Sequence, residues 1–147
     1  IIPQIREKIE ELGLEDMIDI SPFIPHWRVP EFIHSCDATL FLEHGFGIKI
    51  HSPSVPRELL TCGSPFITTA EIANKSIYVD HLRDGENCLV VDDPNDTRSL
   101  SKSILQLRDV AKRQYLSSNA SRTLDTARMR RLAEEIATTI LEAAAED

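Results

Sequence analysis

Four short apolar runs, separated by segments of helical character, decide what this chain can fold into. The runs cover residues 17–24, 37–42, 66–69 and 88–91. Each is bounded by Gly, Pro or Asp, as short strands are, and 37–42 is apolar almost throughout, as in a strand buried on both faces. Because strands alternate with helices along the chain, the sequence predicts an α/β fold with a parallel, Rossmann-like sheet and flanking helices.

The segments between and after these runs predict helices. The expected ranges are 4–14, 29–35, 57–62, 71–82, a helix capped by Asp96, 112–121 and 126–145. A chain of 147 residues with 41% hydrophobic residues suits one soluble globular domain, so we expect residues 1–147 to form a single domain.

Residues 54–69 carry the most specific local pattern. Pro56 suits the first turn of a helix, Gly63 suits a left-handed cap at its end, and Pro65 prevents the helix from continuing into the next strand. Glu58 is then expected in the first helical turn, after a Gly/Ser/Pro loop. Because a helix N-terminus attracts phosphate and a fixed carboxylate accepts hydrogen bonds from a vicinal diol, this pattern favours a nucleotide ligand.

Charge and cysteine content exclude several other classes of function. A net charge of −8 argues against binding to a nucleic-acid backbone. There is no apolar run long enough to cross a membrane, and membrane association is not visible in the sequence. The three cysteines, Cys36, Cys62 and Cys88, form no Cys-x-x-Cys pair, so we expect no zinc site and a reducing, cytoplasmic location.

The order of these motifs resembles that of a known family. Glu58-Leu-Leu-Thr-Cys-Gly-Ser-Pro-Phe-Ile-Thr-Thr69 is similar to the nucleotide-sugar signature of GT-B glycosyltransferases, in the retaining group 1. Residues 17–42 and 81–96 resemble the flanking parts of that domain. The resemblance implies the C-terminal, donor-binding half of a two-domain hexosyltransferase, truncated before its first strand–helix–strand. The isolated chain is then expected to have little activity without its N-terminal domain.

The resemblance also implies roles for residues around the predicted helix start. Glu58 would hydrogen-bond the ribose hydroxyls of the nucleotide. Arg57 would contact the diphosphate or face solvent. Backbone N–H groups of Val55, Arg57 and Glu58, in the loop and turn that begin at Ser54, would hold phosphate oxygens.

A second carboxylate, Glu43, is similar to the family residue that touches the donor sugar. In most members that Glu lies eight positions before the ribose Glu, whereas Glu43 lies fifteen before Glu58. Either the loop is lengthened and Glu43 still reaches the sugar, or the contact is lost.

Other loop residues have two interpretations each. Gly45 and Gly47 suit close approach of a ligand to the backbone, or simply a turn. Lys49 and His51 would neutralise or hydrogen-bond phosphate, or have no role. His26-Trp27 lines the base pocket, or Trp27 packs against the core.

The sequence therefore predicts a UDP- or GDP-sugar as substrate and no metal or other cofactor, since no Asp-x-Asp pair occurs. The alternative is a non-catalytic GT-B-like interaction or regulatory domain with a degenerate nucleotide site, which the altered Glu43 spacing favours. A truncated sheet exposes an edge, so a homodimer through that edge is a further expectation.

Overall fold

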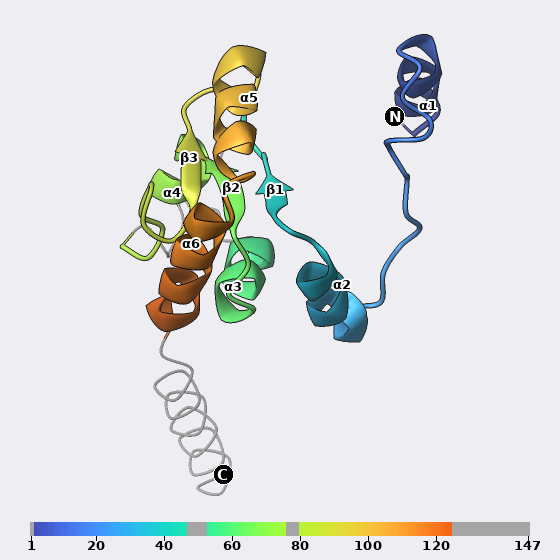
Figure 1. Cartoon of the computed structure of the whole chain (residues 1–147). Helices are drawn as coiled ribbons and strands as arrows, with labels where there is room; N and C mark the ends of the chain where they lie inside the picture. The colour runs from blue at the N-terminus through green and yellow to red at the C-terminus, as the bar shows by residue number, and fades with distance from the viewer. Residues whose placement is uncertain (1, 47–52, 76–79, 125–147) are drawn as a thin grey trace, which may run out of the picture.

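A three-stranded parallel sheet forms the centre of the computed structural model, which describes residues 2–46, 53–75 and 80–124. The strands are β1 (Thr39–Phe41), β2 (Phe66–Thr69) and β3 (Leu89–Val91), in the order β1-β2-β3 (Figure 1). Thr39 pairs with Phe66, and Ile67 pairs with Leu89. The predicted parallel α/β fold is therefore confirmed, and the strand at 66–69 has the predicted bounds.

Helices connect and flank these strands. They are α1 (Ile2–Glu11), the 3-10 turn η1 (His26–Arg28), α2 (Val29–Ser35), α3 (Ser54–Thr61), α4 (Ala70–Lys75), α5 (Thr97–Gln106) and α6 (Val110–Thr123). Asp96 caps α5 as predicted, because its carboxylate accepts the N–H groups of Arg98 and Ser99. The expected helix at 126–145 lies outside the described residues.

The core lies on both faces of β2, whose residues are all buried. On one face Phe66 packs with Leu59 and Leu60 of α3, Ile72 of α4 and Ala120 of α6. On the other face Ile67 packs with side chains of β3 and the α5–α6 region: Leu89, Val91, Leu107 and Leu116. The middle strand is thus the most deeply buried of the three strands.

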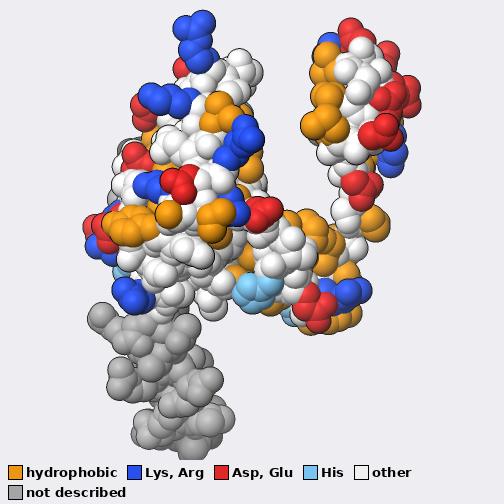
Figure 2. Space-filling model, in the orientation of Figure 1, with side chains coloured by type: hydrophobic (Ala, Val, Ile, Leu, Met, Phe, Trp, Pro, Cys, Tyr) orange, Lys and Arg blue, Asp and Glu red, His pale blue; other side chains and the backbone are white. Residues whose placement is uncertain are grey.

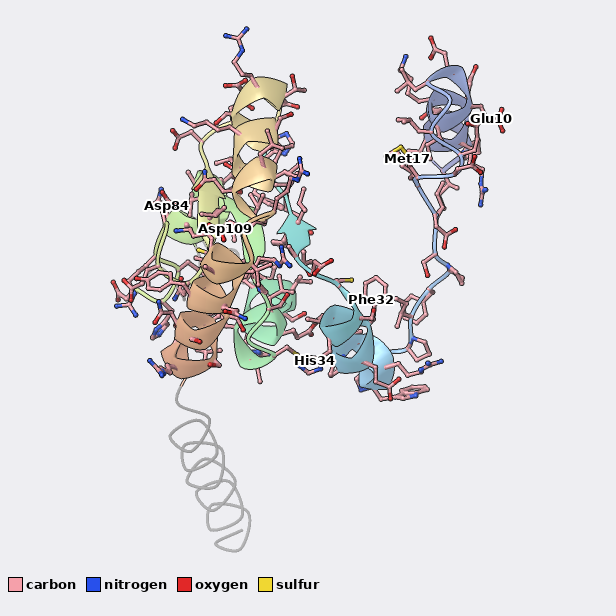
Figure 3. The ribbon with its side chains drawn as sticks, viewed as in Figure 1. Glu10, Met17, Phe32, His34, Asp84 and Asp109 are labelled. Atoms are coloured by element: carbon pink, nitrogen blue, oxygen red, sulfur yellow. The ribbon has the colours of Figure 1, made fainter. Side chains whose placement is uncertain are left out.

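Residues 17–24 do not form the strand that the sequence predicts. The segment runs as an extended connection from α1 to η1, away from the sheet, and Met17 and Phe23 are 81% and 91% exposed (Figures 1 and 3). The prediction was wrong because a strand needs a neighbour to satisfy its N–H and C=O groups, and no described strand lies beside this segment.

Helix α1, like residues 17–24, lies apart from the sheet (Figure 1). Its apolar side chains gather on one side (Figure 2), where Ile5 and Leu12 remain exposed. β1 forms a ladder only with β2 among the described strands, so its other edge carries no described ladder. The homodimer through this edge stays a prediction.

One buried hydroxyl in β2 predicts a stabilising substitution. The Thr68 side chain is fully buried, and its Oγ1 has no hydrogen-bond partner among the described residues. Thr68→Val keeps the shape and removes the unsatisfied hydroxyl, so we expect a gain of about 1 kcal/mol in the free energy of unfolding. Urea unfolding followed by circular dichroism measures it. A lower stability for the valine variant would show that the hydroxyl makes a favourable contact.

Candidate functional site

The candidate site begins at the carboxyl ends of the strands, where open α/β sheets bind their ligands. The chain leaves β1 at Phe41 and reaches Glu43, whose side chain is exposed. The hydroxyl of Thr69, the last residue of β2, donates to the Glu43 carbonyl at 2.7 Å. The loop after β1 is therefore fastened directly to the end of the middle strand.

A carboxylate from the next helix holds the same loop. Glu71, in the first turn of α4, accepts the backbone N–H of Gly45 at 2.7 Å and that of Phe46 at 3.0 Å. Gly45 has a φ of +80°, so its backbone does adopt the turn conformation that favours glycine. Its N–H points to a side chain of this chain, which supports the turn interpretation of Gly45.

Glu58 lies on the wall of a separate cavity of about 180 Å³. This cavity lies between α3 and the η1–α2 segment, and its lining residues are His26, Val29, Pro30, Arg57, Glu58, Thr61 and Cys62. The structure thus brings together three of the candidate residues, Glu58, Arg57 and His26, and their binding roles stay predictions. Because ligand clefts usually measure about 300–1,000 Å³, this cavity suits one portion of a nucleotide rather than a whole one.

The position of Glu58 within its helix differs from the prediction. α3 begins at Ser54, so Glu58 is the fifth helical residue and lies beyond the first turn. The helix begins earlier than expected because Pro56 lacks an N–H that would be unpaired anyway at this position. Glu58 therefore owes its position to the cavity wall and not to the helix dipole.

The early start of α3 also limits which N–H groups can hold an anion. An α-helix uses the N–H groups of its fourth residue onward, here Arg57 and Glu58, so their predicted role as phosphate donors is wrong. The N-cap, Pro53, has no N–H. The N–H groups of Ser54 and Val55 lie before the helix's own hydrogen-bond ladder begins.

The remaining predicted residues divide into two groups. Gly47, Lys49 and His51 lie outside the described residues. Trp27 is 71% exposed, so the interpretation that it packs against the core is wrong. Its ring meets that of His26 edge to face, with centroids 5.4 Å apart, and His26 alone of the two lines the cavity.

Helix α2 also contacts the end of α3 at Cys62, one of the residues that line the cavity. A ring nitrogen of His34, which projects from α2 toward α3 (Figure 3), lies 3.3 Å from the Cys62 carbonyl oxygen. Burial raises the pKa of the Cys62 thiol, and the negative charge of Glu58 raises it further. Cys62 is therefore a neutral thiol that packs in the wall and is not a nucleophile.

At least three larger cavities among the described residues contain no predicted site residue. One, of about 400 Å³, lies against residues 21–25 and α2. The others, of about 350 and 220 Å³, lie along α1 and the residues that follow it. Within the described ranges, no group of His, Cys, Asp and Glu side chains is arranged to hold a metal ion. None of the helices described is long and apolar enough to span a membrane.

Most of the sequence matches a known protein family. Residues 3–123 match the family described as glycosyl transferases group 1. The chain belongs to this family. Among proteins with curated descriptions, none matches the sequence of this group 1 glycosyltransferase chain.

Solved structures support the fold of this glycosyltransferase chain. Sucrose-phosphate synthase from Thermosynechococcus elongatus is similar over 93% of this chain and 34% of the synthase chain, with a TM-score of 0.65 and 19% identity. Anabaena HepE, solved in complex with UDP, is similar over 93% of this chain and 36% of the HepE chain, with a TM-score of 0.67 and 18% identity. The C-terminal domain of the group 1 protein LpcC from Francisella tularensis is similar over 84% and 60%, with a TM-score of 0.62 and 17% identity. These likenesses confirm the predicted Rossmann-like fold of GT-B glycosyltransferases.

The chain is shorter than the solved proteins to which it is similar. The chain spans about a third of the length of the synthase and of HepE. Sequence reasoning named Glu43 and Glu58 as candidates but not Thr69 and Glu71, which hold the loop that carries Glu43. The only signal for those two was their position, at the end of a buried strand and two residues later.

Proposed function

We propose that this chain is the donor-binding, C-terminal domain of a retaining GT-B hexosyltransferase that uses a UDP- or GDP-sugar. The observation that carries the proposal is the half-buried Glu58 carboxylate on the wall of a cavity shared by α3 and η1–α2. A carboxylate held in this way accepts two hydrogen bonds from the vicinal hydroxyls of a ribose. HepE, which shares the fold, has been solved with UDP and with UDP-glucose, which makes a nucleotide sugar the first ligand to test.

The surrounding residues suit the other parts of such a donor. His26 lies on the opposite wall from Glu58 and offers a ring against which a base can pack. The exposed guanidinium of Arg57 and the N–H groups of Ser54 and Val55 offer positive charge and donors to the diphosphate. Stabilisation of the departing diphosphate by such groups, without a metal ion, is our proposed electrostatic mechanism.

The activity of the whole enzyme needs more than this chain. The acceptor would bind between this domain and an N-terminal domain, as the length of the similar structures suggests. We therefore propose little transferase activity for the isolated chain, and a cytoplasmic location in keeping with its free cysteines.

One observation favours a second function. The N–H groups of Gly45 and Phe46, which a donor phosphate would otherwise find free, are both engaged by Glu71. When these backbone N–H groups already have a partner within the chain, they are not available to a phosphate. This suits a non-catalytic interaction or regulatory module with a degenerate nucleotide site. Nucleotide binding separates the two proposals.

The test is a calorimetric titration of the chain with UDP, GDP and ADP. We expect saturable binding of one of the first two, and a loss of at least about tenfold in affinity for Glu58→Ala, since two hydrogen bonds to a charged group are removed. Glu10→Ala, a change of the same kind on exposed α1, is the control and is expected to bind as the parent does. Failure of all three nucleotides to bind would reject the donor-site proposal and favour the regulatory module.

A further inference from the structure

The β2–α4 junction holds the described part of the loop after β1 at three backbone atoms. Thr69 donates to the Glu43 carbonyl, and Glu71 accepts from the N–H groups of Gly45 and Phe46. We infer that Thr69 and Glu71 are positioning residues that fix Glu43 for contact with the sugar part of the donor. This inference rests on the proposed function of the site.

Glu71 holds the loop through two hydrogen bonds, one to each oxygen of its carboxylate. Its two carboxylate oxygens take one N–H each, Oε2 that of Gly45 at 2.7 Å and Oε1 that of Phe46 at 3.0 Å. The left-handed conformation of Gly45 allows successive N–H groups to converge on one anion. Hydrogen bonds to an ionised acceptor are short and strong, so this pair restricts the loop more than two neutral bonds would.

The residues on either side of Glu71 belong to the buried core. Thr69 is fully buried at the end of β2, and its hydroxyl, besides donating to Glu43, accepts the N–H of Ile72 at 3.3 Å. Ile72 is itself only 1% exposed and packs in the main hydrophobic cluster. Glu71 lies between these two fixed residues. A shift of the loop would therefore require a shift of β2 or α4.

The hydrogen bonds from Thr69 and Glu71 also determine how the loop can contact a donor. The N–H groups of Gly45 and Phe46 are engaged by Glu71, whereas the side chain of Glu43, two residues before Gly45, is exposed. The nucleotide part of the proposed site is built by other elements, α3 and η1–α2. The two halves of the donor are thus held by separate parts of the fold, and changes at Glu71 should affect the sugar half alone.

The experiment compares UDP with UDP-glucose by calorimetry on this chain and on Glu71→Gln. The amide keeps one acceptor and loses the second oxygen and the charge. We expect UDP affinity within about twofold of the parent and a loss of about tenfold for UDP-glucose, the effect of one hydrogen bond to a charged group. Glu10→Gln, the same change on exposed α1, is the matched control and should alter neither ligand.

A second pair of variants covers the case in which Glu71→Gln fails to fold. Thr69→Val removes the hydroxyl that donates to Glu43, while Thr69→Ser retains it. We expect the valine variant to lose UDP-glucose affinity with UDP affinity retained, and the serine variant to restore it. A purely structural role for Thr69 would weaken both ligands together.

Each result gives a decision. Equal weakening of both ligands, an unchanged UDP-glucose affinity, or stronger UDP binding in Glu71→Gln would overturn the inference while the nucleotide site stands. Stronger UDP binding would identify the carboxylate as a competitor of phosphate for the loop amides. If the parent chain binds GDP in place of UDP, GDP and GDP-glucose replace the two ligands in this comparison. If it binds no nucleoside diphosphate, the proposed function fails, and this inference fails with it.

Discussion

Replacing Asn87 with alanine is expected to destabilise the chain by about 3 kcal/mol, because three hydrogen bonds of about 1 kcal/mol each are lost. Asn87 is fully buried before β3, and each of its polar atoms is used. Its Oδ1 accepts the N–H of Arg83 at 2.9 Å, and its Nδ2 donates to the His81 carbonyl at 2.6 Å and to Thr123 Oγ1 at 2.7 Å. Alanine can replace none of these contacts.

The effect of this substitution should spread beyond one turn. The hydrogen bond to Thr123 joins the turn before β3 to the C-terminal part of α6, 36 residues later. α6 holds the same turn at two further points, since Lys112 donates to the Gly85 carbonyl and Asn119 to the Glu86 carbonyl. Loss of Asn87 would therefore loosen α6, which covers the core around Phe66.

Urea unfolding of Asn87→Ala, followed by circular dichroism, measures the predicted loss. Asn95→Ala is the matched control, because Asn95 is an exposed asparagine whose amide bonds only to exposed side chains. We expect the control to change the free energy of unfolding by less than about 1 kcal/mol. A loss for Asn87→Ala no larger than that of Asn95→Ala would show that the buried network contributes little.

The sequence predicted those elements of the fold that local chemistry determines. The strand at 66–69 and the cap at Asp96 depend on residues within a few positions, and both are confirmed. The segment 17–24 has equally apolar composition but forms no strand, because a strand also depends on a neighbour that no local pattern specifies. Residues 81–96 resembled a flanking part of the family's domain, yet the anchoring of the turn at residues 84–87 to α6 depends on residues far along the chain.

The candidate site shows the same division. Glu58, Arg57 and His26 line one cavity, but the helix that carries Glu58 begins at Ser54, so the carboxylate is not in the first turn as predicted. Two prolines at one helix start left its first residue ambiguous, because proline is tolerated at any position whose N–H is unpaired. Glu71 was missed because nothing in its sequence neighbourhood reveals that it accepts hydrogen bonds from a loop 25 residues earlier.

Gly63→Ala is expected to cost about 2–4 kcal/mol, through two separate effects at the end of α3. Gly63 has a φ of +62°, and its N–H and that of Ser64 close the helix by donating to the carbonyls of Leu60 and Leu59. The left-handed conformation alone costs alanine about 1–2 kcal/mol. An added Cβ would also lie 3.3 Å from Ser121 Cβ and 3.4 Å from the Ser117 carbonyl oxygen of α6.

Two comparisons separate the backbone effect from the contact with α6. Gly85→Ala places the same side chain at a φ of +71° with no atom within 4 Å, so it reports the backbone cost alone. Gly63→Asn carries a Cβ but tolerates the left-handed conformation better, so it retains the steric cost. We expect urea midpoints in the order parent, Gly85→Ala, Gly63→Ala. Equal losses for the two alanine variants would mean that α6 moves aside freely. The spacing between α3 and α6, on which the wall bearing Glu58 depends, would then not be set by Gly63.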